Sequence, residues 1–286
     1  MNVLVATDGS EYGRWELNWV AELPFVEPPR VTALHVLDLR AIRAPRGPFL
    51  SQAGSERYLQ KELLRMETRS AKTIKKAKQQ LVLLKLKGMA RKEQGDIAPT
   101  ILKRAPKRDG LLVVGSKGLD ALDRFMLGSV STKLIHHATC PVLVVKNEAT
   151  PVGQIALAID GSDASANALE FVRTKFQPDR STGKGGRVSI HVRVIHVMPF
   201  SNYQELKEAR KLLEQGVRKL IQAGFTAEAV CLRGRPAEEI MKITSKHHAD
   251  LIVMGAKGLG AIARFLLGSV STRVVQHATC SVLVVR

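Results

Sequence analysis

The feature that most constrains this chain is a stretch of 35 residues that it contains twice. Residues 111–145 read LLVVGSKGLDALDRFMLGSVSTKLIHHATCPVLVV, and residues 251–285 read LIVMGAKGLGAIARFLLGSVSTRVVQHATCSVLVV. The two stretches align without a gap at an offset of 140. With 286 residues, of which 45% are hydrophobic, the chain is long enough for two domains that each have a core. The repeat therefore predicts two similar units in tandem.

Each copy of the repeat begins as a buried strand and continues into a glycine-rich loop. The apolar, β-branched runs 111–114 and 251–254 stop at Gly115 and Gly255. A short helical stretch follows, and Gly-Ser-Val-Ser then opens a second helix. Glycines let a ligand approach the backbone, and a helix N-terminus offers unpaired N–H groups and a positive dipole end. The stretch therefore predicts a cradle for an anion, most plausibly phosphate.

Strands and helices alternate along the remainder of both halves. Strands that alternate with helices predict a parallel sheet of five strands in each half. The expected strands cover 2–8, 31–37, the residues up to Gly95, 111–114 and 142–145 in the first half, and 154–160, 188–198, the residues up to Gly234, 251–254 and 282–285 in the second. The expected helices include 12–23, 97–105 and 237–246, and residues 146–153 form the linker.

Two aspartates, Asp8 and Asp160, end the first strands. Ligands of open α/β sheets bind at the carboxyl ends of the strands. If the first and fourth strands are neighbours, each aspartate meets a glycine cradle and accepts hydrogen bonds from a sugar or a base. The alternative is that each aspartate only caps its own turn through Asx-type bonds. His35 and His196 lie within apolar strands, and we interpret them as core histidines with satisfied hydrogen bonds rather than catalytic groups.

Several function classes find no support in the composition. The chain has no apolar run long enough to span a membrane and no signal peptide, so we expect a soluble cytoplasmic protein with no membrane partner. The three cysteines, Cys140, Cys231 and Cys280, have neither a disulfide pattern nor a metal-ligand spacing. Cys140 and Cys280 are expected to be buried thiols.

The net charge of +18 is concentrated in residues 57–92, where twelve lysines and arginines face only Glu62 and Glu67. Apolar residues recur there at roughly helical spacing, which predicts an amphipathic helix with a basic outer face. This face is either a solvated surface or a site for an anionic partner such as nucleic acid, a membrane surface or an acidic protein. The second half does not repeat it.

Together these residues resemble two universal stress protein domains in tandem, over nearly the whole chain. The resemblance rests on the aspartates, on His-Val in both second strands, on the spacing Gly-x2-Gly-x9-Gly-Ser, and on the closing motifs ATCPVLVV and ATCSVLVV. It implies domains at 1–147 and 152–286, each a Rossmann-like fold of the adenine nucleotide alpha hydrolase-like type. Each would hold a parallel sheet of order 3-2-1-4-5 with helices on both faces.

The resemblance also implies one ATP site in each domain. The residues that match the family's binding positions are Asp8, Val36, Val114, Gly115, Gly118, Gly128, Ser129 and Val130 in the first domain, and Asp160, Val197, Met254, Gly255, Gly258, Gly268, Ser269 and Val270 in the second. Four cations either meet the outer phosphates or are solvated, namely Lys117, Arg124, Lys257 and Arg264. The sequence leaves open whether Mg²⁺ accompanies the nucleotide.

Three functions fit these observations. The first is a nucleotide-dependent regulator in the stress response without catalysis, because no catalytic arrangement of side chains accompanies the cradle. The second is a slow ATPase or phosphotransfer enzyme, although the loop has no Gly-Lys-Ser/Thr and no recognisable acidic metal site. The third is an adaptor that binds anions or nucleic acid through residues 57–92.

The fifth strands predict how the two halves associate. A short apolar strand at a sheet edge invites pairing with its equivalent. The resemblance implies the same arrangement, so we expect a pseudo-dimer within one chain. Association of two chains as a homodimer stays open.

Overall fold

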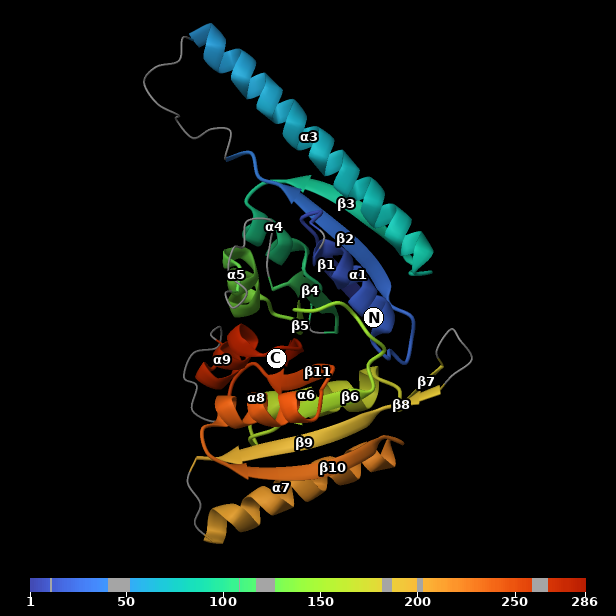
Figure 1. Cartoon of the computed structure of the whole chain (residues 1–286), viewed down its shortest axis with the longest axis vertical. Coiled ribbons are helices and arrows are strands. Elements are labelled where there is room, and N and C mark those ends of the chain that lie inside the picture. Colours follow the sequence, from blue (N-terminus) through green and yellow to red (C-terminus); the bar gives the residue numbers. More distant parts are fainter. Residues whose placement is uncertain are drawn as a thin grey trace.

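The protein is represented by a computed structural model that describes residues 1–10, 12–40, 52–107, 109–116, 127–181, 187–199, 203–258 and 267–286. One ten-stranded sheet runs through the whole molecule (Figure 1) in the order β10-β9-β6-β11-β12-β5-β4-β1-β2-β3. The first half supplies β1 (Asn2–Ala6), β2 (Arg30–Leu37), β3 (Gly88–Gln94), β4 (Leu111–Gly115) and β5 (Val142–Val145). The second half supplies β6 (Gln154–Ala158), β9 (His191–Met198), β10 (Thr226–Arg233), β11 (Leu251–Gly255) and β12 (Ser281–Val285).

Within each half the order of the strands is 3-2-1-4-5, as predicted, and all neighbouring strands are parallel. The first and fourth strands are direct neighbours, with Ala6 opposite Val114 and Ala158 opposite Met254. The fifth strands join the halves through an antiparallel pair in which Leu143 lies opposite Leu283. The predicted pairing of the fifth strands within one chain is thus present.

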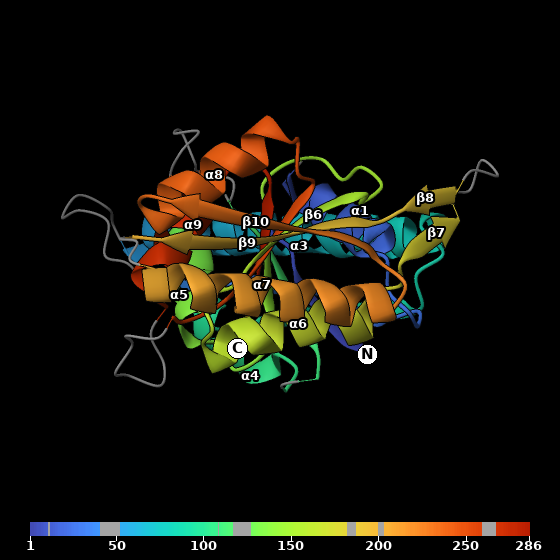
Figure 2. The same cartoon turned by 90° about the horizontal axis from the view of Figure 1, so that it is seen from below.

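Helices cover both faces of the sheet and close two buried clusters. One face carries α1 (Tyr12–Glu22), α3 (Gln52–Leu83), α6 (Asp163–Lys175) and α7 (Tyr203–Gln222), and the other carries α4 (Ile97–Arg104), α5 (Ser129–His137), α8 (Pro236–Lys246) and α9 (Ser269–His277). Figure 2 shows α7 and α8 on opposite sides of β9 and β10. Both clusters contain strand residues of both halves, so each face has one core that runs across the junction.

Polar contacts reinforce the junction between the halves. Ser281 Oγ donates to Asn147 Oδ1 at 2.9 Å and accepts from the Lys146 N–H at 3.1 Å. Trp19, which is fully buried, donates its indole N–H to the Asn147 carbonyl at 2.8 Å. On the α1 side, Phe25 and Phe176 form an isolated antiparallel bridge, with ring centroids 5.9 Å apart.

The predicted basic helix ends earlier than expected. Residues 57–92 were predicted as one helix, but α3 covers Gln52–Leu83 and the chain then turns into β3. Lys85 has a φ of 55°, and the Leu86 N–H donates to the Leu81 carbonyl at 2.9 Å. This is a Schellman termination, which satisfies a terminal carbonyl and stops the helix. The same geometry ends α7 at Gly224, where glycine gives the sequence signal that Lys85 lacks.

The expected strand over 188–198 is also wrong at its start. Residues before 190 belong to a separate hairpin of β7 (Asp179–Ser181) and β8 (Arg187–Ser189), and β9 begins at His191. The Ile190 N–H donates to the Pro178 carbonyl at 2.8 Å, so the chain leaves the ladder at that point. No helix in the described ranges is long and apolar enough to cross a membrane. The expected helical stretch between Gly118 and Gly128 lies mostly outside the described residues.

Truncating the junction should destabilise the whole chain. We expect Leu283→Ala to lower the free energy of unfolding by about 2–5 kcal/mol, because Leu283 is fully buried opposite Leu143 and its loss leaves a cavity. Urea denaturation followed by circular dichroism measures this. Leu83→Ala is the matched control, since Leu83 is 80% exposed and its truncation should change stability by less than about 0.5 kcal/mol. Equal effects of the two variants would contradict the assigned junction.

Candidate functional site

The described parts of the repeated stretch form a strand and a helix that are joined by the same hydrogen bonds in both halves. In the second half, the Ala256 N–H donates to Val285 and the Gly268 N–H donates back to the Ala256 carbonyl at 2.8 Å. Ser271 Oγ then donates to the Gly255 carbonyl at 2.9 Å. These bonds fix the start of α9 beside the end of β11.

The first half repeats these bonds with its own residues. The Gly128 N–H donates to the Ser116 carbonyl at 2.8 Å, and Ser131 Oγ donates to the Gly115 carbonyl at 2.6 Å. Both helices start with glycine at the N-cap, where no side chain makes a capping hydrogen bond. The N–H groups of the first turn therefore have no side-chain cap, and the positive dipole end is available to an anion.

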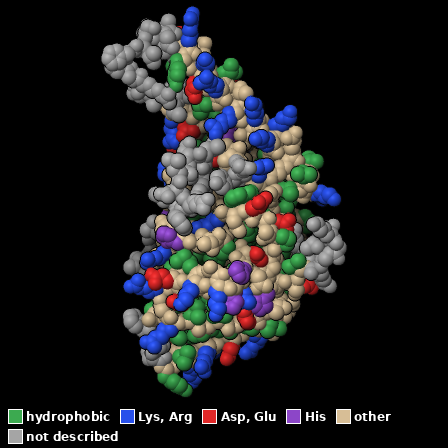
Figure 3. Space-filling model, viewed as in Figure 1, with side chains coloured by type: hydrophobic (Ala, Val, Ile, Leu, Met, Phe, Trp, Pro, Cys, Tyr) green, Lys and Arg blue, Asp and Glu red, His purple; other side chains and the backbone are tan. Residues whose placement is uncertain are grey.

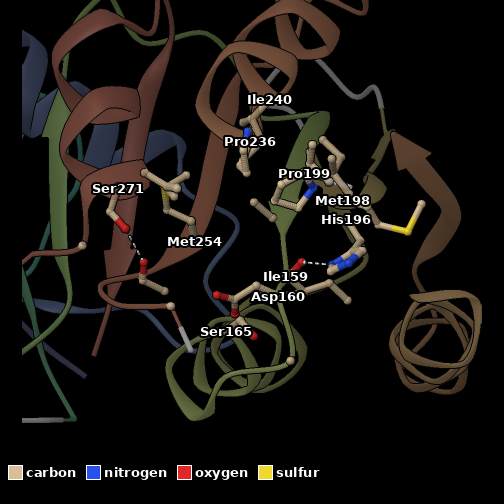
Figure 4. A pocket seen from close by; sticks show the side chains of 18 of the residues that line it. Ile159, Asp160, Ser165, His196, Met198, Pro199, Pro236, Ile240, Met254 and Ser271 are labelled. Carbon is tan, nitrogen blue, oxygen red and sulfur yellow. Dashed lines mark hydrogen bonds between the residues drawn. The ribbon is translucent and has the colours of Figure 1, made fainter. Parts of the chain in front are cut away.

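A cavity of about 1160 Å³ opens at this place in the second half. It lies at the carboxyl ends of β6, β9 and β11, where ligands of open parallel sheets bind. All eight residues predicted as the second site line it, namely Asp160, Val197, Met254, Gly255, Gly258, Gly268, Ser269 and Val270. In Figure 4, His196 and Met198 lie across the cavity from Met254 and Ser271, with Asp160 between them.

The three glycines of the second site differ in what a side chain at each position would contact. A Cβ on Gly255 would lie 2.6 Å from the Ala164 carbonyl carbon, so glycine is required for α6 to pack against β11. A Cβ on Gly258 would lie 2.5 Å from Asp160 Oδ2, the carboxylate oxygen that faces the loop. Among the described residues, a Cβ on Gly268 would meet no atom closer than 3.5 Å, so their packing does not require glycine there.

Each aspartate uses one oxygen for its own turn and leaves the other one available. Asp160 Oδ1 accepts from the Ser162 N–H at 3.0 Å and from Ser162 Oγ at 2.6 Å. Asp8 Oδ1 accepts from the Ser10 N–H at 2.8 Å, while Asp8 Oδ2 is buried and has no hydrogen-bond partner. In Asp160, which lines the cavity, the Asx-type turn thus coexists with a second oxygen that faces the loop at Gly258.

Each predicted core histidine makes a hydrogen-bond contact through Nδ1, but both side chains are half-buried and His196 lines the cavity. His35 Nδ1 lies 2.9 Å from the Thr7 carbonyl, and His196 Nδ1 lies 2.9 Å from the Ile159 carbonyl. Cys140 and Cys280 are buried free thiols, and burial raises the pKa of each to about 11. These thiols are therefore protonated at neutral pH.

The first half holds its predicted residues in equivalent positions. Asp8, Val36, Val114, Gly115, Gly128, Ser129 and Val130 follow or end the corresponding strands or open α5. Gly118 lies outside the described residues, as do the predicted phosphate contacts Lys117, Arg124 and Arg264. Lys257 is described, and it lines the second cavity.

Sequence reasoning missed the walls of the cavity that come from outside the repeat. Leu212 and Ala209 of α7 form one wall, and Pro236 and Ile240 of α8 form another. Their apolar helical spacing is indistinguishable in the sequence from that of ordinary core residues. Glu205 and Glu208 of α7 also line the cavity.

Glu16 of α1 is a further residue that the sequence did not single out. It is only 4% exposed, and its Oε2 atom has no hydrogen-bond partner among the described residues. Burial raises the pKa of its carboxyl group well above the ordinary value of 4.5, and the neighbouring Asp8 carboxylate raises it further. A hydrogen bond from the Gly115 backbone acts in the opposite direction. The second half has Ala168 at this position, eight residues after Asp160.

Comparisons with known proteins agree with this architecture. The sequence profile of the universal stress protein family matches residues 1–146 and again residues 152–286. A universal stress protein of Mycolicibacterium smegmatis is 30% identical over 99% of this chain and 96% of its own length. One from Synechocystis sp. is 24% identical over 100% of this chain and 99% of its own. The crystal structure of a universal stress protein from Archaeoglobus fulgidus superposes with a TM-score of 0.73 at 21% identity, covering 100% of this chain and 98% of that one.

Neutralising Glu16 should stabilise the protein in a pH-dependent way. Below pH 4.5 Glu16 is protonated in both the folded and the unfolded protein, and its burial carries no cost of ionisation. As the pH rises through the raised folded-state pKa, this stability is lost, because the buried carboxyl group resists ionisation while the unfolded one ionises freely. Glu16→Gln removes this loss, so we expect it to raise the free energy of unfolding by about 1–3 kcal/mol at pH 8 and by less at pH 5. Urea denaturation at both pH values measures the difference. A gain that is larger at pH 5 would contradict this assignment.

Proposed function

Because the chain belongs to the universal stress protein family, we propose that it is an ATP-binding regulator with one nucleotide site in each of two domains, residues 1–147 and 152–286. The observation that supports this most is the second-half cavity, which all eight predicted binding residues line. Its volume of about 1160 Å³ is slightly above the roughly 300–1,000 Å³ of typical ligand sites, so it has room for a whole nucleotide.

The arrangement of the second site suits each part of ATP. The phosphates would bind at the N-terminus of α9, where Gly268 leaves space and the N–H groups of Ser269 and Val270 are close. The ribose or base would donate to Asp160 Oδ2. The adenine ring would lie between the apolar walls that Val197 and Met254 contribute.

Any Mg²⁺ would enter with the nucleotide rather than bind to a site built by the protein. No group of three or more His, Cys, Asp or Glu residues in the described ranges could hold a metal ion. Mg²⁺ commonly keeps several waters and binds through one or two carboxylates plus substrate phosphates.

Binding without efficient turnover fits the chemistry of the second site. His196, the histidine in its cavity, has its Nδ1 atom within hydrogen-bond distance of the Ile159 carbonyl. The repeat-equivalent thiols are protonated at neutral pH, which makes them poor nucleophiles. We therefore propose that ATP acts here as a ligand that changes the protein's shape or partner, and not as a substrate in steady turnover.

Substitution of Gly258 tests the second site. We expect the unaltered chain to bind close to two ATP molecules, and Gly258→Val to bind close to one, because the valine side chain enters the space beside Asp160 Oδ2. Isothermal titration calorimetry of the nucleotide-free protein measures the stoichiometry, and the same samples are assayed for released ADP. The control is Gly153→Ala, because an added Cβ there would meet only side-chain atoms and Gly153 does not line the cavity. Unchanged stoichiometry in Gly258→Val would refute the assignment, and steady ADP release would favour an enzyme.

A second candidate function is the binding of nucleic acid through α3. The outer face of α3 carries lysines and arginines without ion-pair partners among the described residues, namely Arg57, Lys61, Arg69, Lys72, Lys75, Lys76 and Lys78. The helix extends past β3 at one end of the molecule (Figure 1), and blue side chains gather over it in Figure 3. Its equivalent α7 mixes three glutamates with five cations. An unpaired basic row suits a phosphate backbone.

Matched lysine substitutions on the two helices test this second function. We expect Lys61, Lys72 and Lys76 together changed to alanine to weaken binding of a labelled DNA duplex by about tenfold or more at 100 mM salt. The control removes three exposed lysines of α7, Lys207, Lys211 and Lys219, which lowers the net charge equally. Fluorescence anisotropy measures both affinities. Equal weakening by the two triple variants would show an effect of net charge alone and would reject α3 as the binding face.

A further inference from the structure

The two candidate sites share a backbone but differ in the side chains around it. The inward-facing residues of α3 and α7 recur with the same spacing, Ser70-Ile74-Ala77-Leu81 matching Ala209-Leu213-Gly216-Leu220. The glycine that follows each aspartate packs against the matching helix residue, Gly9 against Thr73 and Gly161 against Leu212. The apolar wall that Ala209 and Leu212 give the second cavity therefore corresponds to Ser70 and Thr73 in the first half.

The first half has three buried polar atoms that lack hydrogen-bond partners among the described residues. Three such oxygens are Asp8 Oδ2, Glu16 Oε2 and Ser70 Oγ, and Ser70 is fully buried. In the second half Ala168 and Ala209 replace Glu16 and Ser70. A buried polar atom without a partner costs about 1–3 kcal/mol. Their presence in one half only indicates a difference in what the two sites bind.

Glu16 lies against two residues of the proposed first site. The Gly115 backbone hydrogen-bonds to its carboxyl group, and the Asp8 carboxylate is close enough to disfavour its ionisation. The equivalents of these two residues, Gly255 and Asp160, both line the second cavity. A negative charge on Glu16 would therefore act directly on a ligand in the first site through a low-dielectric surrounding.

Among the described residues, the other groups around Glu16 carry no charge toward it. α1 packs against β1, β4, β5 and α3. The strands present apolar residues, and α3 presents the hydroxyl groups of Ser70 and Thr73. Lys146, which follows β5, directs its ammonium group to the carbonyls of Gln276 and Ala278. Asp8 is therefore the charged neighbour that acts on Glu16 within the described part of the chain.

We propose that the first site binds its nucleotide together with a proton held on Glu16, whereas the second site binds its nucleotide without one. This inference rests on the proposed function. A nucleotide would bring its phosphates into a site that already holds the Asp8 carboxylate, so an ionised Glu16 would add a further negative charge to that site. Protonation of Glu16 removes one of these charges, so proton and nucleotide favour each other's binding by the same factor. The proton comes from solvent and returns to it when the nucleotide leaves.

The pH dependence follows from the direction of the pKa shifts. Burial and Asp8 already raise the pKa of Glu16, and a bound phosphate raises it further. Below the pKa of the free site the proton is present before binding, and affinity does not depend on pH. As the pH rises through that pKa, each binding event must take up a proton, and affinity falls by up to tenfold for each pH unit. The second site lacks the group and should not follow this course.

Calorimetry on the full chain carrying Gly258→Val tests the proposal, because only the first site then remains. ATP is titrated between pH 6.5 and 9 in two buffers with different ionisation enthalpies, which gives the number of protons taken up. We expect the parent to take up as much as one proton more than a variant that also carries Glu16→Gln. Protons taken up by ATP itself are the same for both proteins and cancel in the comparison. The Gln variant should keep the higher affinity across the pH range.

Glu16→Ala, which copies Ala168, provides a second variant for the same titration. It should also lose the proton uptake and the pH dependence, whether or not it changes the absolute affinity. Equal proton uptake in the parent and both variants would overturn the proposal while leaving ATP binding intact. Absence of ATP binding to the unaltered chain at every pH would instead refute the proposed function, so the two failures are distinguishable.

Discussion

The antiparallel pairing of β5 with β12 is the interaction on which the rest of the structure depends. It merges two five-stranded sheets into one and gives both faces a continuous core. The residues that follow these strands, Lys146 and Arg286, are repeat-equivalent and act reciprocally. Lys146 donates to carbonyls at the end of α9, and Arg286 donates to the Ile135 carbonyl of α5. Each half therefore places a cation at the C-terminal end of the other half's cradle helix, where the dipole favours it.

The parts of the fold that the sequence predicted best are those with strong local signals. The apolar runs before Gly115 and Gly255 specified the fourth strands, and Gly-Ser-Val-Ser specified the starts of α5 and α9. The strand order came from the family resemblance, because periodicity gives no strand order. The pairing of the fifth strands was predicted from their short apolar edge as well as from the resemblance. Ends set by tertiary contacts were predicted poorly. Lys85 ends α3 in the left-handed conformation that glycine usually adopts at such positions. The Ile190 N–H donates to the Pro178 carbonyl instead of to a neighbouring strand.

The candidate site was predicted to a similar degree and for the same reason. The repeat contains the cradle, so its glycines and serines could be found from spacing alone. The cavity walls come from α7 and α8, whose residues contact the cavity only after the chain has folded. Glu16 was missed because its neighbours in sequence are ordinary helix residues. Only burial, an oxygen without a partner and the proximity of Asp8 distinguish it from a solvated glutamate.

A tandem chain can give its two sites different chemistry, which an assembly of identical subunits cannot. In a symmetric dimer, a buried glutamate beside one cradle would also lie beside the other, and both copies would lower the free energy of unfolding. Here the first half carries Glu16, while the second half keeps Ala168 and an apolar wall at Leu212. The reciprocal contacts of Lys146 and Arg286 join the helices behind the two cradles. A ligand that shifts one cradle helix would therefore also act on the contacts that join the two halves.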